Sequence, residues 1–304
     1  MVSPTFYIDR LSPIMRATVY ALCAALFFSF MAICIRAASE ELHPTVIVFF
    51  RNILALLWMV PWLSRAGLGA MRTDRFSLFC VRSLLGLVGM TSGFWAVTLI
   101  PISQATALSF SSPIFATIGA ALFLGEIVRI RRWSAVIIGF LGAMIVVLGN
   151  SKGIAQIGAL ELGVLLALLN AVIMASNKLV LKSLTRTERP EVIVTYMVLL
   201  LTPLSPFPAL LFWSWPSLYC LLWLIILALV GTVGHLCMTR AFKSADVTVV
   251  LPFDFARLPI SALLAFFIFS EIPTFWTVLG GAVIFASTFY IARREAALAQ
   301  LREK

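Results

Sequence analysis

Charged side chains are scarce in this chain. Only 12% of its 304 residues are charged, 62% are hydrophobic, and the mean hydropathy is +1.04. A soluble protein cannot cover its surface with so few charges. The composition therefore excludes a soluble globular domain and indicates a polytopic membrane protein.

Groups that support catalysis or metal binding are also few. The two histidines, His43 and His235, are far apart, and Asp254 is the one aspartate inside an apolar segment. The five cysteines lie in apolar segments without CxxC spacing, which indicates neither a metal site nor a disulfide framework. The sequence has no nucleotide-binding loop and no HExxH motif. These absences argue against an ATP-driven pump, a metalloenzyme and a bound cofactor.

The chain does contain a series of long apolar segments. They predict an all-α integral membrane protein with ten transmembrane helices. The first segment follows Asp9 and Arg10 and is too long for a signal-peptide core, so we expect it to be retained. The ten expected spans are residues 14–35, 44–63, 76–99, 102–124, 133–149, 158–181, 192–212, 218–239, 247–269 and 274–292.

The net charge of +10 is placed unevenly along the chain. Alternate connections are rich in Lys and Arg, whereas the intervening connections hold Arg36 and Lys152 alone. This is the positive-inside bias, which places both termini in the cytoplasm. The basic charge therefore orients the protein among membrane lipids and does not indicate a nucleic-acid partner. The oligomeric state is left open.

The expected span 247–269 carries charges in its interior. Asp254 and Arg257 lie between Pro252 and Pro259, and Arg257 falls about 15 Å into the span at 1.5 Å per residue. Ionised groups at that depth are costly, and they usually pair or mark a transport pathway. The spacing allows the acid and the base to pair with each other as a structural unit. The alternative is that both belong to a polar site, where the prolines interrupt the helix.

Other spans carry single basic residues whose role the sequence leaves open. Arg51 lies in the second expected span and Arg82 in the third, each about two turns from one end. Either residue could extend its charge to the membrane surface or take part in a site. Lys178 lies near the cytoplasmic end of the sixth span, and there we expect such an extended side chain.

A second polar interruption occurs in the fourth expected span. Ser109, Ser112 and Pro113 lie there, and Pro113 frees the carbonyl of Ser109. In the eighth span His235 is a candidate proton carrier, although a packing role is the more common one for a lone histidine.

An internal repeat relates the two interruptions. Residues 86–126 align without a gap to residues 231–271, with seven identities in 41 pairs. The two copies are separated by an odd number of expected spans, so they must point in opposite directions. The charges of the equivalent connections support opposite orientations, since IVRIRRW after Glu126 is basic whereas IPTFW after Glu271 is not. This pattern predicts an inverted repeat, with both interruptions at equivalent depths.

The stretches SQATALSFSSPIFATIGAALFLGE and GTVGHLCMTRAFKSADVTVVLPFDFARLPISALLAFFIFSE resemble the drug/metabolite transporter superfamily, specifically its ten-span EamA branch. The resemblance covers nearly the whole chain. It implies two inverted five-helix repeats, residues 1–150 and 151–304, around a central cavity that opens by alternating access. A location in a bacterial inner membrane is expected. The substrate-binding residues that the resemblance and the in-span charges suggest are Phe94, Trp95, Ser109, Ser112, Asp254, Arg257, Arg51 and Arg82.

Roles other than substrate binding are also expected. Glu126 and Glu271 are expected at span ends in packing or gating, and Asp254 and His235 are candidates for proton coupling. The repeat is imperfect at the interruption, where Arg257 stands in place of Ser112.

The function predicted from these features is secondary transport of a small polar or amphipathic metabolite. The in-span arginines favour a substrate with an anionic group, such as an amino acid or derivative, a cofactor-like metabolite or an organic acid. The alternatives are an intramembrane enzyme, which would need a paired acid and base, and a membrane scaffold without transport, which would not explain charges at the centre of a repeat.

Overall fold

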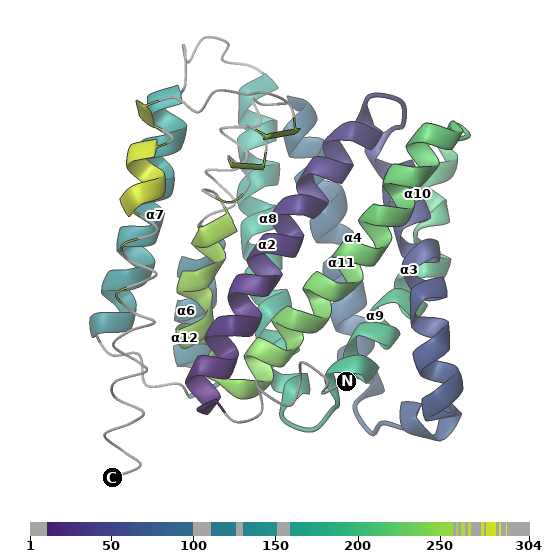
Figure 1. The fold of residues 1–304 in the computed structure, drawn as a ribbon, viewed down its shortest axis with the longest axis horizontal. Helices are drawn as coiled ribbons and strands as arrows, with labels where there is room; N and C mark the ends of the chain where they lie inside the picture. The colour runs from purple at the N-terminus through teal and green to yellow at the C-terminus, as the bar shows by residue number, and fades with distance from the viewer. Residues whose placement is uncertain are drawn as a thin grey trace.

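The fold is a bundle of long helices, several of which are inclined to one another (Figure 1). The structure is a computed structural model that describes residues 11–99, 111–125, 130–150, 159–257 and short stretches between 260 and 290. Within these residues, six helical segments are long and apolar enough to cross a membrane. They are Pro13–Ser39, Pro44–Ala66, Phe76–Gly93, Leu165–Thr185, Pro190–Leu210 and Leu218–Ser244.

Local sequence signals explain where the first two helices begin and end. Helix α2 (Pro13–Ser39) starts with a proline after Ser12, whose side chain accepts a hydrogen bond from the backbone N–H of Met15. Helix α3 (Pro44–Ala66) starts in the same way after His43. It ends at Gly67, where φ is +73°, a conformation that glycine adopts without strain. The short 3-10 helix η1 (Leu68–Met71) follows.

Two close helix pairs form the centre of the bundle. Helix α4 (Phe76–Leu99) packs against α8 (Ala159–Thr185), and α11 (Leu218–Ser244) packs against α2 (Figure 1). Glycines allow both approaches. A Cβ at Gly89 would lie 2.1 Å from Met174 Cε, and one at Gly234 would lie 2.9 Å from Phe28 Cε1. These glycines therefore lie at the close contacts between the two helices of each pair.

Further helices surround these pairs. Helix α9 (Pro190–Leu204) is followed by α10 (Pro206–Leu210), and both begin with a proline. Helix α6 (Ser112–Phe123) contacts α8, and α7 (Ile130–Asn150) lies at the outer edge of the bundle (Figure 1).

The backbone is interrupted where the sequence predicts it. Helix α12 (Val247–Val250) has a single turn and passes into the 3-10 helix η2 (Leu251–Ala256), which has Pro252 at its start. Two contacts hold η2 in place. The ring of Phe255 lies against Gly139 of α7, and the hydroxyl of Ser29 in α2 donates to the carbonyl of Arg257 at 3.0 Å. The predicted break at Pro252 is therefore confirmed.

The count of ten spans stays a prediction. The described part of the chain contains six candidate spans, and α7 adds a 21-residue helix over the expected span 133–149. The expected spans 102–124, 247–269 and 274–292 lie partly outside the described residues.

Candidate functional site

A cavity of about 460 Å³ lies at the centre of the bundle. Helices α2, α3, α4, α8, α9 and α11, the start of α6 and the interrupted segment at η2 all contribute to its wall. Most of the wall is apolar. The charged and polar side chains that line it are Arg51, Arg82, Ser112, Asn170, Asn177, Lys178, His235, Asp254 and Arg257.

Arg51 and Arg82 are buried, with 3% of each residue exposed. One guanidinium nitrogen of Arg51 donates to Asn52 Oδ1 at 2.9 Å, and one of Arg82 makes a long contact of 3.6 Å with the sulfur of Met197. The other two nitrogens of each group are buried without a hydrogen-bond partner among the described residues. Neither side chain extends to the membrane surface, so that alternative is wrong for both.

Asp254 is paired, but its partner is Lys178. Lys178 Nζ donates to Asp254 Oδ2 at 2.5 Å, which links α8 to η2. The expectation that Lys178 extends to the surface is therefore wrong, as is the alternative in which Asp254 pairs only with Arg257. The guanidinium of Arg257 instead lies over the ring of Phe28, 5.1 Å from its centroid.

The cavity is strongly positive. Among the described residues that line it, four side chains are cationic and Asp254 is the only carboxylate. Arg257 and His235 both pack against the ring of Phe28, so they lie close together at the cavity wall. Such a wall favours a ligand with negative charge or several hydrogen-bond acceptors.

Two further predicted residues, Ser112 and His235, lie in the described part of the chain. Ser112 lines the cavity, and its hydroxyl is buried without a partner among the described residues. His235 also lines the cavity and packs edge-on against Phe28, with ring centroids 5.0 Å apart. This contact is the packing role expected for a lone histidine. A role for His235 in proton transfer stays a prediction.

Several predicted residues cannot be placed in this site. Ser109, Glu126 and Glu271 lie outside the described residues. Phe94 and Trp95 belong to α4, but their side chains lie outside the described part.

One face of α8 was not predicted as part of the site. Asn170, Met174, Asn177, Lys178 and Leu181 all line the cavity. Their spacing of i, i+4, i+7, i+8 and i+11 is that of one helix face, so the signal was present in the sequence. Asn177 also donates to the backbone carbonyl of Arg82 at 3.3 Å, which joins this face to α4.

Methionines form much of the apolar wall. They come from five different helices and are Met31, Met90, Met174, Met197 and Met238. Methionine side chains are flexible and polarisable, and their sulfur atoms contact aromatic rings favourably. This lining suits a ligand with a planar ring system.

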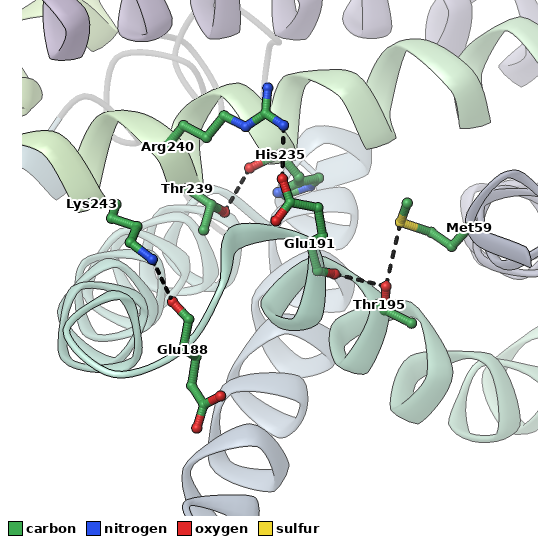
Figure 2. A network of polar contacts seen from close by, with 8 residues as sticks. All are labelled: Met59, Glu188, Glu191, Thr195, His235, Thr239, Arg240 and Lys243. Atoms are coloured by element: carbon green, nitrogen blue, oxygen red, sulfur yellow. Dashed lines mark hydrogen bonds and ion pairs between the residues drawn. The ribbon is translucent and has the colours of Figure 1, made fainter. Parts of the chain in front are cut away.

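The helices around the cavity are tied together at both ends. At the lower end in Figure 1, Arg240 of α11 donates to Glu191 of α9 at 2.7 Å, and Lys243 donates to the carbonyl of Glu188 at 3.2 Å (Figure 2). At the other end, both carboxylate oxygens of Glu41 accept hydrogen bonds from Ser217, the residue before α11.

Comparison with known families decides the class of protein. The model of the EamA-like transporter family matches residues 15–148 and again residues 161–293. The chain belongs to the EamA-like transporter family. The family and its apolar helices make this EamA chain an integral membrane protein of the drug/metabolite transporter superfamily.

Relatives of this EamA chain carry the names of transporters. A riboflavin transporter of Rhizobium johnstonii is 36% identical over 81% of this chain and 80% of its own length. A riboflavin transporter of Vibrio cholerae is 31% identical over 92% of this chain and 94% of its own length. An S-adenosylmethionine uptake transporter of Rickettsia prowazekii is 29% identical over 84% of this chain and 85% of its own length. These relatives indicate a transporter of small metabolites and not an enzyme.

The fold is also found in a solved crystal structure. That protein has a TM-score of 0.80 and 19% sequence identity, and the match covers 95% of this chain and 99% of the other. At this identity the likeness concerns the fold alone.

Proposed function

We propose that this protein is a secondary transporter that carries a small metabolite with an anionic or acceptor-rich group through the central cavity by alternating access. The observation that carries this proposal is the pair of buried arginines. Arg51 and Arg82 line the cavity, and two nitrogens of each guanidinium have no partner among the described residues. A buried donor without a partner costs about 1–3 kcal/mol, more when it is charged, and a ligand oxygen would remove that cost.

The rest of the wall narrows the substrate class. A volume of about 460 Å³ falls within the range of small-molecule sites. The methionines favour a planar ring, and the relatives are named for riboflavin and S-adenosylmethionine, which both contain planar heterocycles. We therefore take the flavins, riboflavin and its anionic 5′-phosphate, as the first candidates and S-adenosylmethionine as the second.

Alternating access is supported by the arrangement of the helices. Helices α4 and α11, which carry the aligned glycines Gly86 and Gly231, run in opposite directions (Figure 1). The family model matches the chain twice. In an inverted-repeat transporter, the ties between helices at one end of the bundle open while those at the other end close around the site. The Glu191–Arg240 and Glu41–Ser217 contacts are the candidates for these two sets of ties.

The experiment that tests this function is uptake into proteoliposomes. Riboflavin, riboflavin 5′-phosphate and S-adenosylmethionine would be compared as labelled substrates for the wild type, Arg82→Met and Arg65→Gln. Loss of one charged hydrogen bond is worth about 1.5–3 kcal/mol, so Arg82→Met should weaken binding of the transported ligand about 10–100-fold. Arg65 is exposed at the end of α3, so Arg65→Gln is the matched arginine control and should leave uptake unchanged.

Two results would contradict the proposal. The first is that folded wild-type protein takes up none of the three compounds. The second is that Arg82→Met takes up its substrate with the same affinity as Arg65→Gln, because the buried arginine would then be structural.

A further inference from the structure

We propose that the carboxylate of Asp254 accepts a hydrogen bond from a neutral donor on the substrate's ring. Lys178 is the positioning residue that holds this carboxylate in place. The ligand class is then a planar nitrogen heterocycle with a ring N–H between acceptors, such as the imide edge of a flavin. This inference rests on the proposed function and names the part of the substrate that the η2 side of the cavity recognises.

The first observation is that the Asp254 carboxylate is only half satisfied. Oδ2 accepts from Lys178, whereas Oδ1 is buried and has no hydrogen-bond partner among the described residues. Asp254 is 7% exposed, and both members of the pair line the cavity. A purely structural ion pair would be expected to satisfy both oxygens, because an unpaired buried acceptor costs free energy.

The second observation is that the carboxylate stands on a fixed support. The ring of Phe255 is fully buried against Gly139, and Ser29 holds the carbonyl of Arg257. The residues on both sides of the carboxylate are therefore anchored, Phe255 to α7 and Arg257 to α2. Lys178 adds the contact with α8. A recognition group needs this kind of support, since small displacements weaken a directional hydrogen bond.

The surrounding charges select the kind of donor. Lys178 donates to the other oxygen of this carboxylate, and Arg257, three residues along the chain from Asp254, lines the same cavity. An ammonium group brought to the free oxygen would be repelled by these two cations, whereas a neutral N–H would not. The same cations can donate to acceptors next to that N–H. A ring N–H flanked by carbonyl oxygens therefore complements an acceptor beside two cationic donors better than a cationic group does.

The test compares two ligands that differ in this donor alone. Binding of riboflavin and of 3-methylriboflavin, in which a methyl group replaces the imide hydrogen, would be measured by equilibrium dialysis with purified protein. The wild type should prefer riboflavin about tenfold or more, because the methylated ring leaves the buried oxygen unpaired. This comparison needs no variant and so does not depend on how well a variant folds.

Variants then assign the preference to the ion pair. Lys178→Met with Asp254→Leu removes both charges together, which avoids a stranded charge, and should bind the two flavins with equal affinity. Lys178→Arg retains a cation and should keep most of the preference. The control is Arg65→Gln, which removes a charge from the exposed end of α3, outside the cavity wall, and should preserve the preference in full.

The outcomes separate this inference from the proposed function. Equal binding of the two flavins by the wild type would overturn the role of Asp254 and leave flavin transport standing. A preference that survives in the Lys178/Asp254 double variant would also overturn it, because another group would then read the donor. Failure of folded wild-type protein to bind riboflavin at all would overturn this inference together with the flavin assignment.

Discussion

The buried guanidinium groups of Arg51 and Arg82 place function and stability in opposition. Each group is withdrawn from water and is incompletely hydrogen-bonded within the described part of the chain. Removal of such a group relieves a desolvation cost, whereas removal of one member of a satisfied pair strands its partner. Substitution of a buried arginine without full hydrogen bonding and substitution of an ion-paired arginine should therefore change the stability of the protein in opposite directions.

The first prediction concerns the sign of this response. Arg82→Met should raise the thermal midpoint of the ligand-free protein, or leave it unchanged, while it reduces the shift that a fixed concentration of ligand produces. Arg240→Met should lower the midpoint, because Glu191 loses its 2.7 Å partner. The measurement is thermal unfolding in detergent with and without riboflavin. A lower midpoint for ligand-free Arg82→Met would show that Arg82 has a structural role.

The second prediction uses two glycines that align in the internal repeat. A Cβ at Gly231 would lie 3.1 Å from Met31 Sδ and 3.3 Å from Arg51 Nη2, so Gly231→Ala should displace the Arg51 guanidinium by a few tenths of an ångström. Its affinity for ligand should fall several-fold with little loss of stability. Gly86→Ala is the control, since its nearest neighbours would be at 3.5 and 3.9 Å. Equal affinities of the two variants would show that the position of Arg51 does not control binding.

For individual residues, the sequence indicated which residue types belong to the site but not which side chains pair with each other. In-span charges such as Arg82 and Asp254 are conspicuous because the bilayer penalises them. Which carboxylate meets which cation depends on contacts between helices remote in the chain. The pair of Lys178 and Asp254 spans 76 residues, so local spacing favoured the neighbour Arg257 instead.

Among the elements, η2 determines the shape of one side of the cavity. Its 3-10 geometry places Asp254 and Arg257 at the cavity wall, while Phe255 is directed toward α7. The break itself was predictable because Pro252 lacks an N–H and cannot continue the α-helical bonding pattern. The contact with Gly139 was not, because it joins two segments more than a hundred residues apart.

The third prediction tests the support of η2. A Cβ at Gly139 would lie 2.5 Å from Phe255 Cδ2, and this ring is fully buried. Gly139→Ala should therefore shift η2, destabilise the protein by about 1–3 kcal/mol and impair uptake. Gly119→Ala is the control, because the atom that it would meet at 2.4 Å is the flexible end of Leu179. The measurement is thermal unfolding combined with uptake, and equal effects of the two variants would contradict a special role for η2.

For the whole molecule, the basic connections of the described part gather at one end of the bundle. The end of α3, the turn after α8 and the end of α11 all lie at the lower end in Figure 1, and they carry Arg65, Arg186 and Lys243. The positive-inside bias predicts that this end faces the cytoplasm. Charge patterning thus predicts the orientation of the protein, although the sequence cannot supply the packing of its helices.

The fourth prediction is an inverted topology of ten spans. Single cysteines at Gln104 and Pro273 should react with an impermeant thiol reagent added to intact cells. Cysteines at Arg131 and Ser244 should react only after the cells are opened. Labelling at Arg131 in sealed cells would contradict the orientation, and protection at Pro273 would contradict the number of spans.

The close packing of α2 against α11 also has a consequence for the way the protein is made. Phe28 meets Gly234 only after about 200 further residues have left the ribosome, which takes roughly 10–40 s at typical rates of synthesis. Until then the face of α2 that packs against α11 has no partner helix in the bilayer. The binding cavity cannot exist on a partly synthesised chain, so assembly of this transporter is completed late in translation or after it.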